Sequence, residues 1–482
     1  MELFGYQKEA VGFIGETKTA YLALDMGMGK TLTALSAAAG LAKKNVLVIA
    51  EKNEIVNSEN FKREVETHFP GRFQYYSLRD KETPPIADYS PAYVCGINPD
   101  GLKKIDEDFL LKCFDFVIID EATMAKTTTT DRFKVVYKIC KKMPHVVLLS
   151  GTPMMNGAAE LWAPLLLLDH PITGDKTAKD RMAFEKIFAG GGYKQIRSIK
   201  NQDEEYVRKH WWMFYAWSAK GANRVRELRY ILRDKFFIMQ KGQTDVFKKK
   251  TRSTVMVPMS LEWLSEYTNA WDEYYDAFDP KRQEALDETM EDYAGLRRII
   301  ENGKMYQVNS HWKAKRVAQD IVDGVYGDRR IVVFSMYIET DQIIQSELGR
   351  HGISWRTFED VKEWKQGAEQ VLIGRIKAHG KGGNAAEASV CLMVDMDFVP
   401  ANNIQAENRI DRPEQKNDMD VVYYLTEGED VVDHHVRAIN KDKARKIDEF
   451  MRPFTDEELA EMPAKLVELR AKFPRECERL GI

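Results

Sequence analysis

A glycine-rich turn between an apolar run and an apparent helix stands out in LALDMGMGKTLTAL, residues 22–35. Such a turn binds phosphate groups because its unblocked backbone N–H groups and the positive end of the helix converge on the anion. Gly27 and Gly29 flank Met28 and allow the backbone to approach a ligand closely. Leu24 stands where the general phosphate-loop pattern has its first glycine, so the turn taken alone also fits an ordinary loop.

Two acids at the end of a second apolar run provide the rest of a nucleotide site. In FDFVIIDEAT, residues 114–123, the run ends in Asp120 and Glu121. We expect Lys30 to reach the outer phosphates of ATP, and the Thr31 hydroxyl and Asp120 to ligate Mg²⁺. Glu121 would orient and deprotonate the attacking water. An isolated Asp-Glu pair is usually a solvated loop, but its place downstream of a phosphate turn favours Mg²⁺-assisted ATP hydrolysis.

These residues must be positioned by strands, and short apolar runs bounded by polar loops recur along the chain. Buried runs of this kind, with helical spacing between them, are typical of parallel sheets covered on both faces. The pattern predicts an α/β fold with two lobes. The expected strands are VLVIA (46–50), AYVCGI (92–97), FVIID (116–120) and VVLLS (146–150) in the first lobe, and RIVVFS (330–335), QVLIG (370–374), VCLMVD (390–395) and VVYYL (421–425) in the second.

The segments between and after the lobes have mainly helical spacing. WWMFYAW (211–217) and LEWLSEYTNAWDEYYDAF (261–278) suggest packed or partner-facing helices. KKKTR (248–252) is expected to be a solvated face, with a phosphate contact as the alternative, and TDEEL (455–459) predicts the start of a helix. We therefore expect a first lobe at 1–168, a helical insertion and linker at 169–258, a helical insertion of the second lobe at 259–310, the second lobe at 311–450 and a charged helical tail at 451–482.

Composition excludes several other classes of protein. The chain has 482 residues, 44% of them hydrophobic and 30% charged, which suits two globular domains. No apolar stretch approaches the roughly 18 residues of a membrane span, and MELFGYQKEAVGF lacks the pattern of a secretion signal, so we expect an intracellular protein. Five scattered cysteines without a CxxC pair disfavour a disulfide framework and a zinc site. Because the net charge is −4, any nucleic-acid groove must depend on local patterning.

Taken together, the motifs resemble the two-lobed motors of helicase superfamily two, and the fuller match is to the Swi/Snf-like ATPases, over roughly residues 1–450. FGYQKEAVGFI (4–14) resembles the opening adenine-reading segment, which would give Gln7 a base contact. LLSGTPMMNGAAELWAPLLLL (148–168) resembles the coupling segment of the first lobe, and VPANNIQAENRIDRPEQ (399–415) resembles the closing arginine motif of the second. The resemblance implies two tandem RecA-like lobes with helical insertions between them.

The arginine motif would supply positive charge to the nucleotide from the second lobe. Arg409 and Arg412 are three residues apart, so one helical face would present both guanidinium groups to the phosphates across the cleft. An arginine from the opposite lobe stabilises charge in the transition state and makes hydrolysis depend on closure. The resemblance also places Gln405 at the nucleotide. Two surface arginines on a helix are the alternative.

The resemblance implies a DNA track that is held mostly through its phosphate backbone. AEKNEIVNSENFKREVETHF (50–69) resembles the family's strand-gripping segment, with Asn60-Phe61 where Asn-Trp is common. IKAHGKGGNAAEAS (376–389) resembles its glycine-rich coupling loop and keeps Gly380, Gly382 and Asn384. The residues expected to contact nucleic acid are Lys52, Asn60, Gly151, Thr152, Asn156, Ser335, Arg375 and Lys377.

Three departures from the family pattern affect coupling between ATP and DNA. DEAT replaces DEAH, which leaves Thr123 in the place of the histidine. Arg375-Ile376 stands where Ser-Thr is usual. The stretch FFIMQKGQTDVF (236–247) occupies the place of a paired-arginine stretch and keeps little of its basic character.

The resemblance implies an ATP-driven translocase that moves along duplex or branched DNA, in repair, recombination or replication-fork remodelling. The pared-down chain suggests a bacterial, archaeal or viral motor, with a further protein partner bound through the helical insertions or the tail. One rival is a strand-separating helicase that acts on branched DNA or RNA. The other is a nucleic-acid-binding scaffold whose ATPase has decayed, which the full set of Lys30, Thr31, Asp120, Glu121, Arg409 and Arg412 disfavours.

Overall fold

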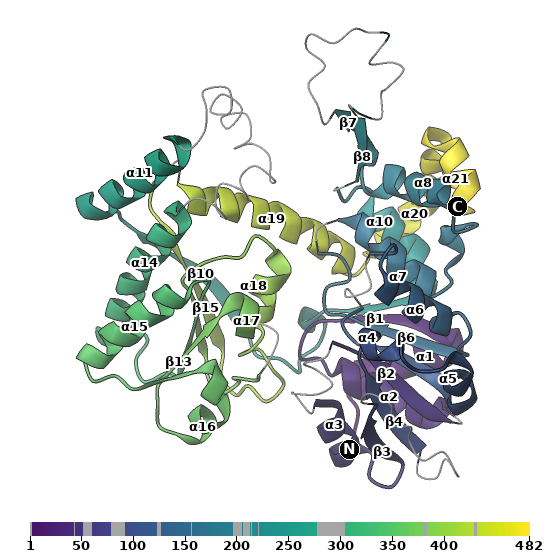
Figure 1. Ribbon diagram of the computed structural model, residues 1–482, viewed down its shortest axis with the longest axis horizontal. Coiled ribbons are helices and arrows are strands. Elements are labelled where there is room, and N and C mark those ends of the chain that lie inside the picture. The colour runs from purple at the N-terminus through teal and green to yellow at the C-terminus, as the bar shows by residue number, and fades with distance from the viewer. Residues whose placement is uncertain are drawn as a thin grey trace. The chain divides into compact units, whose positions relative to one another are not determined.

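The chain forms two compact units in the computed structural model (Figure 1). The first unit contains residues 1–240 and 446–482, and the second contains residues 241–445. The structure describes residues 2–42, 44–51, 60–78, 92–122, 127–155, 157–195, 205, 213, 215–219, 221–276, 304–379, 383–428 and 431–482. The boundaries of the two units therefore differ from the expected domain boundaries. The linker gives one strand to each sheet, and the C-terminal tail packs in the first unit.

A fully parallel sheet forms the centre of the first unit. Its strand order is β3-β4-β2-β5-β6-β1-β9, and every neighbouring pair runs parallel. The five inner strands are almost entirely buried, as expected for apolar runs covered on both faces, while the edge strands β3 and β9 are only partly buried. Their bounds are β1 Thr19–Leu24, β2 Asn45–Ile49, β3 Phe73–Ser77, β4 Ala92–Ile97, β5 Phe114–Ile119, β6 His145–Leu149 and β9 Phe236–Met239.

Helices cover both faces of this sheet. On one face α2 packs against β5 and β6, with α1 beside it. On the other face the main apolar core joins alternate strand residues, such as Tyr21 and Ala23, to α4, α5, α6, α7, α8 and α10, while α3 contacts α2 and β3. The bounds are α1 Gly5–Thr17, α2 Lys30–Leu41, α3 Asn60–His68, α4 Pro99–Leu102, α5 Glu107–Cys113, α6 Asp131–Cys140, α7 Trp162–Leu167, α8 Ala178–Phe188 and α10 Val225–Ile231, with 3-10 turns at Ala158–Leu161, Pro171–Thr173 and Leu232–Asp234.

A two-stranded hairpin projects from the first unit where a helix was expected. β7 (Gly192–Gln195) pairs antiparallel with β8 (Tyr215–Ser218), so the helical interpretation of residues 211–217 is wrong at 215–217. The cause is the aromatic character of the segment, because Tyr193 and Trp217 form a cross-strand pair with ring centroids 5.3 Å apart. Trp217 Nε1 also donates to Glu185 Oε2 at 2.6 Å, which fixes the hairpin on α8.

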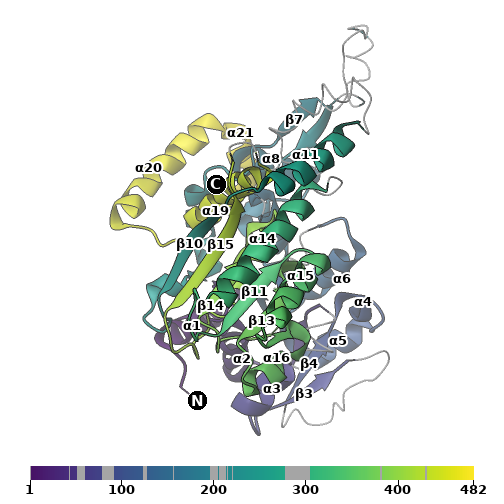
Figure 2. The ribbon, with the colours of Figure 1, turned by 90° about the vertical axis from the view of Figure 1, so that its left-hand side faces the viewer.

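The second unit is built on another fully parallel sheet, of order β10-β15-β14-β11-β13-β12. α11, α14 and α15 share an apolar core with one face of it, and Figure 2 shows α14 and α15 side by side on the sheet. α16, α17 and α18 share a second core with the opposite face. The bounds are β10 Lys250–Val257, α11 Leu261–Asp276, α14 Met305–Val322, β11 Ile331–Ser335, α15 Ile338–Arg350, β12 Trp355–Thr357, α16 Val361–Gln366, β13 Val371–Arg375, α17 Ile376–His379, β14 Val390–Met393, α18 Pro400–Glu407 and β15 Met419–Thr426, with 3-10 turns at Lys241–Gln243 and Phe358–Asp360.

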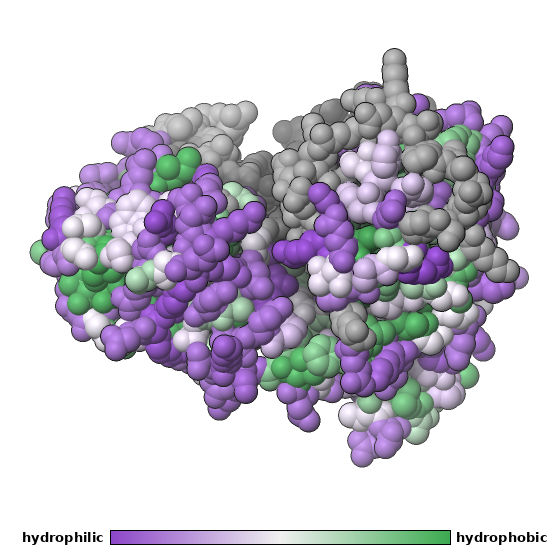
Figure 3. Space-filling model, turned by 90° about the horizontal axis from the view of Figure 1, so that it is seen from below, coloured by the Kyte–Doolittle hydropathy of each residue, from purple (hydrophilic) through white to green (hydrophobic). Residues whose placement is uncertain are grey.

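These observations confirm the expected α/β class, with two tandem parallel lobes of the RecA-like kind, and each of the eight predicted strands is present within one or two residues. All five cysteines are free and buried. Among the described residues no helix is long and apolar enough to span a membrane. On the face drawn in Figure 3, hydrophilic side chains prevail and hydrophobic ones form scattered patches.

The C-terminal segment is helical, as predicted, and it is built into the first unit. It comprises α19 (Val432–Met451), α20 (Asp456–Lys472) and α21 (Pro474–Leu480). α19 begins in the second unit and ends in the first. Thr455 caps α20 through a capping box with Glu458, which confirms the helix start predicted at 455–459.

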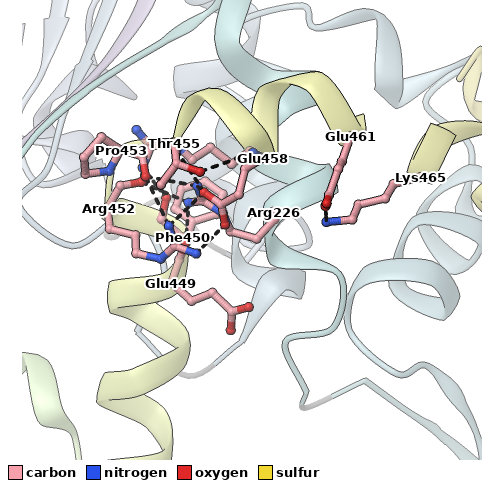
Figure 4. Close-up of polar contacts among 10 residues, drawn as sticks. Arg226, Glu449, Phe450, Arg452, Pro453, Thr455, Glu458, Glu461 and Lys465 are labelled. Carbon is pink, nitrogen blue, oxygen red and sulfur yellow. Dashed lines mark hydrogen bonds and ion pairs between the residues drawn. The ribbon is translucent and has the colours of Figure 1, made fainter. Parts of the chain in front are cut away.

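Two arginines of α10 hold the corner between α19 and α20 (Figure 4). Arg226 donates to the carbonyl oxygens of Glu449, Arg452 and Pro453 at 2.8–3.0 Å and to Glu458 Oε2 at 2.7 Å. Arg229 donates to the Phe450 carbonyl at 2.7 Å. These bonds satisfy carbonyl groups at the end of α19 that no helical N–H group can reach.

Candidate active site

The predicted phosphate turn lies between β1 and α2, at the carboxyl edge of the first sheet. Gly27 and Gly29 have φ angles of 86° and 74°, a left-handed conformation that glycine adopts without steric cost. A Cβ atom at position 29 would lie 2.5 Å from Nε2 of Gln7. The glycines are therefore required both for the shape of the turn and for the close approach of its neighbour.

Lys30 and Thr31 form the first turn of α2, directly after the glycines. Nζ of Lys30 donates to the carbonyl oxygens of Leu24 and Asp25, at 3.0 and 3.4 Å, so the lysine head lies over its own turn. This position would let the ammonium group exchange those carbonyls for the outer phosphates of a nucleotide.

Gln7 is connected to the phosphate turn through its side-chain amide. Its Nε2 donates to the Met28 carbonyl at 3.2 Å, and the Tyr6 hydroxyl donates to the same oxygen at 3.1 Å. The Oε1 atom of Gln7 accepts from the Phe4 N–H group at 3.0 Å, and the residue is only 3% exposed. Helix α1 is thereby fixed to the turn, while a contact between Gln7 and a base stays a prediction.

Asp120 and Glu121 follow β5 directly. Asp120 Oδ1 accepts from the N–H group of Glu121 at 3.0 Å, and its own N–H group donates to the Ile49 carbonyl at 2.9 Å. Glu121 has a φ angle of 46°, a strained conformation for a residue with a side chain, of the kind that concentrates at functional sites. Because β5, β6 and β1 are adjacent and parallel, the acids leave the sheet at the same edge as the phosphate turn. Thr123 lies outside the described residues.

The turn after β6 completes this edge. A Cβ atom on Gly151 would lie 2.9 Å from Cγ of Met26 and 3.4 Å from Nζ of Lys30. The Thr152 N–H group donates to the Ser150 hydroxyl at 3.2 Å, and Thr152 is 6% exposed. Gly151 and Thr152 were expected to contact DNA, which stays a prediction, and the structure puts Gly151 against the phosphate turn. Asn156 lies outside the part of the chain that the structure describes.

This set of groups fits a magnesium nucleotide. The glycine turn and the first turn of α2 supply N–H donors and a lysine for phosphate. The Thr31 hydroxyl and the Asp120 carboxylate are the hard oxygen ligands that Mg²⁺ prefers. Within the described ranges there is no cluster of three or more His, Cys, Asp or Glu side chains that would form a separate metal site.

The arginines of the second unit do not share a helical face, so that prediction is wrong. α18 ends at Glu407, and Arg409 and Arg412 lie in the turn and bend that follow. Pro413 further disfavours helical geometry at Arg412, the residue before it. Arg409 is 4% exposed and donates to the Gly383 carbonyl at 2.9 Å. Nε of Arg412 is buried without a hydrogen-bond partner among the described residues.

Two residues of the second unit that were expected to contact nucleic acid, Ser335 and Lys377, differ in their exposure. The Ser335 side chain is fully buried and donates to Asp341 Oδ1 at 2.5 Å, so it supports the lobe and does not face a DNA backbone. Burial raises the pKa of Asp341 to about 6, although the Ser335 hydrogen bond and Arg375 oppose this rise. Lys377 is 63% exposed, with Nζ 3.5 Å from Asp397 Oδ2. Exposure leaves Lys377 available to a phosphate.

The remaining expected residues are placed only in part. Gln405 lies in α18 and is 4% exposed. Arg375 ends β13, with Nε 3.9 Å from Asp341 Oδ2. Asn60 begins α3. Lys52, Gly380 and Gly382 lie outside the described residues.

Sequence reasoning missed three linker cations that contact the arginine turn, which we define as the segment 408–412 that carries Arg409 and Arg412. Lys241, Lys250 and Arg252 contact Glu407 or Asp411 through ion pairs. The expectation of a solvated face at 248–252 is therefore wrong for Lys250, whose side chain is 15% exposed. The available signal was the strand alternation of Lys250 and Arg252 in KTRSTVMV, which puts both side chains on one face of β10.

Comparison with known proteins shows a match over most of the chain. Residues 6–332 match the family model described as the SNF2-related domain. Similar proteins include the SWI/SNF-related matrix-associated actin-dependent regulator of chromatin subfamily A-like protein 1 homolog of Caenorhabditis elegans, which is 24% identical over 88% of this chain and 58% of its own length. The putative ATP-dependent helicase/translocase YwqA of Bacillus subtilis is 22% identical over 85% of this chain and 44% of its own length. The chain thus spans about half the length of these curated relatives.

A solved structure with a similar arrangement is the Sulfolobus solfataricus SWI2/SNF2 ATPase core in complex with dsDNA. It is 18% identical to this chain, with a TM-score of 0.41, and the match covers 98% of this chain and 96% of that one. The same core without DNA gives a TM-score of 0.39.

Proposed function

This chain belongs to the SNF2-related family, and we propose that it is a DNA-dependent ATPase that moves along duplex or branched DNA. The observation that carries the proposal is the meeting of three segments at one edge of the first sheet. The phosphate turn follows β1, the acids follow β5, and the Gly151 turn follows β6. The dsDNA in the similar Sulfolobus core and the translocase relative of Bacillus subtilis are consistent with the substrates proposed.

In the proposed reaction the first unit holds the nucleotide. The N–H groups of the glycine turn and Lys30 hold the phosphates, and Thr31 and Asp120 hold Mg²⁺. The bound metal would neutralise charge on the transferred phosphoryl group. Glu121, fixed in its unusual backbone conformation, orients the attacking water and accepts its proton.

The second unit supplies the remaining charge. We propose that Arg409 and Arg412 reach the phosphates when the lobes close, which makes hydrolysis depend on closure. Release of product would then reopen the lobes and move the chain along the phosphate backbone. Repair, recombination and replication-fork remodelling are the processes to which such a motor would contribute.

The test is DNA-stimulated phosphate release by Lys30→Ala and Glu121→Gln. Both variants should keep duplex affinity within about twofold and lose at least about 100-fold in kcat, because each removes a group that acts only on the phosphates or the water. Lys134→Ala removes a lysine that is 64% exposed on α6 and should behave as wild type. Wild-type turnover in either site variant would refute the proposal.

The same assay separates the two rivals. If DNA does not stimulate ATP hydrolysis by the wild-type protein, the result would favour the nucleic-acid-binding scaffold with a decayed ATPase. Turnover with release of a labelled strand from forked DNA or RNA would indicate a strand-separating helicase. Turnover on duplex DNA without strand release is the outcome expected here.

A further inference from the structure

The chain enters the second unit at Lys241, and this residue contacts the arginine turn directly. Its Nζ donates to the Asp411 carbonyl at 2.6 Å and lies 3.0 Å from Asp411 Oδ2. It also donates to Asn408 Oδ1 at 3.4 Å and lies 4.8 Å from the centroid of the Phe247 ring. The side chain is 11% exposed, so these contacts are largely shielded from water.

Two cations of β10 hold the same acids. Lys250 Nζ lies 2.9 Å from Asp411 Oδ2 and 3.4 Å from Glu407 Oε2. Arg252 donates to both carboxylate oxygens of Glu407 at 2.6–3.0 Å. The side chains of Glu407 and Asp411 are 1% and 4% exposed. Loss of one cation would leave a buried carboxylate with a single cationic partner, which costs more than the loss of a surface ion pair.

The segment that these cations hold has no helix of its own. After α18 ends at Glu407, residues 408–412 form a turn and a bend. Asp411 stands between Arg409 and Arg412 in this segment, and Gln415 Nε2 donates to the Ile410 carbonyl at 3.1 Å. These side-chain contacts therefore act together with backbone bonds, such as that of the Ile410 N–H group to the Glu407 carbonyl at 3.3 Å, in fixing the backbone that carries both guanidinium groups.

We propose that Lys241 is a positioning residue that sets the direction of Arg409 and Arg412 through its bonds to Asp411. This inference rests on the proposed function, because it assigns a role to the arginines in ATP hydrolysis. Lys241 directly follows Gln240, the last residue before the crossing between the units. A movement of the chain at the Gln240–Lys241 boundary would therefore reach the arginine turn through the Lys241 side chain. Hydrolysis would be coupled to lobe motion at this contact.

The protonation of this cluster supports the assignment. Burial lowers the pKa of Lys241 to about 7, with Lys250 and Arg412 acting in the same direction and Asp411 opposing them. Burial alone would raise the pKa of Asp411, but Lys250 and Lys241 outweigh it and the pKa is lowered. Asp411 thus stays ionised near neutral pH while Lys241 titrates. Below pH 7 the lysine is charged and binds Asp411, and this charge is lost as pH rises.

The experiment uses the full chain with saturating duplex DNA and compares Lys241→Met with Lys241→Arg. We expect Lys241→Met to lower kcat about tenfold while KM for ATP changes less than about threefold, since misdirected arginines affect mainly the transition state. Lys241→Arg keeps a cation and should restore at least about half of the wild-type kcat. Lys416→Met removes an exposed lysine four residues after Arg412 and should leave kcat unchanged.

A pH profile gives a readout that needs no destabilising variant. In the wild type, kcat should fall as pH rises from about 6 to 8.5, because Lys241 loses its proton in this range. Lys241→Arg should remove this fall, because arginine remains charged throughout. The titratable and charged groups that face Lys241 are Asp411 and Arg412 of the turn and Lys250 of β10.

Asp411→Asn provides a second route to the same contact. It keeps the shape of the side chain and should lower kcat as Lys241→Met does, and the double variant should lose little more than either single one. If the wild type hydrolyses ATP with DNA and Lys241→Met matches Lys416→Met, the positioning role is refuted while the proposed function stands. If the wild type shows no DNA-stimulated hydrolysis, the proposed function itself fails.

Discussion

Glycine 29 is the residue whose substitution gives the sharpest test of the phosphate turn. Its φ angle of 74° disfavours any side chain, and a Cβ atom would collide with Nε2 of Gln7. We expect Gly29→Ala to displace Gln7 from the Met28 carbonyl and to raise KM for ATP about tenfold, since the loss amounts to about 1.4 kcal/mol of binding. Nucleotide titration followed by steady-state kinetics would measure it.

The matched control for Gly29→Ala is a glycine of the adjoining helix. Gly40 lies near the end of α2, where a Cβ atom would meet nothing within 4 Å. Gly40→Ala should leave KM unchanged and raise the free energy of unfolding by up to about 1 kcal/mol, because alanine suits a helix better. Equal KM values for the two variants would show that position 29 is not constrained by the nucleotide turn.

At this scale the sequence predicts residue types better than conformations. The spacing of Gly27, Gly29 and Lys30 predicted a phosphate turn only together with the acids at 120–121, and the left-handed φ angles of both glycines fit such a turn. The partners of Gln7 could not be predicted, since its amide contacts Met28, which is 21 residues away. The place of Arg412 was misjudged because the proline after it ends helical geometry.

Among the elements, the corner between α19 and α20 depends on the two arginines of α10. Arg226 is 8% exposed and donates to three carbonyl oxygens and to Glu458, and its guanidinium carbon lies 4.0 Å from the centroid of the Phe454 ring. The Arg452 hydrogen bond, together with Thr455 and Arg226, lowers the pKa of Glu458 to about 2. The carboxylate therefore remains charged and bound to both arginines at neutral pH.

We expect Arg226→Met to destabilise the first unit by about 3 kcal/mol, because it leaves buried carbonyl groups without their donor and removes one of the two arginines that bind Glu458. Urea unfolding would measure this change, and proteolysis should cleave earlier between α19 and α20. Lys465→Met, which removes the exposed pair with Glu461 in Figure 4, should cost at most about 0.5 kcal/mol. A difference below about 1 kcal/mol between the variants would show that the corner does not depend on Arg226.

The strands were predicted more accurately than the connections between them. VLVIA, FVIID and the other apolar runs are buried on both faces, so hydrophobicity alone identifies them. β9 and β10 were missed because FFIM and KTRSTVMV are only partly buried, and their strand state is set by pairing with β1 and β15. Long-range pairing of this kind leaves a weak local signal.

For the whole molecule, the second unit is an insertion into the first. The chain leaves the first unit after Gln240 and returns at Lys446. Within the first unit Gln240 Nε2 donates to Asp448 Oδ1 at 3.2 Å, so the points of departure and return lie beside each other. A fold with this topology completes its first core only after the second unit has been synthesised.

This topology predicts that residues 1–240 cannot fold without residues 446–482. Phe450, Met451, Leu469, Cys477 and Leu480 belong to the main core of the first unit and are at most 2% exposed. Their removal would forfeit on the order of 8 kcal/mol of burial, which is comparable to the stability of an entire domain. Residues 241–445 keep the apolar cores on both faces of their sheet and should unfold cooperatively as an isolated fragment.

The decisive experiment compares fragment 1–240 with a chain in which a short flexible linker joins Gln240 directly to Lys446. Because these positions are already close, the joined chain should regain a cooperative thermal transition that fragment 1–240 lacks, yet it should not hydrolyse ATP because it has no arginine turn. Circular dichroism and phosphate release measure the two properties separately. A cooperative transition in fragment 1–240 alone, at the same temperature as the joined chain, would mean that the C-terminal helices only cover a core that is complete without them.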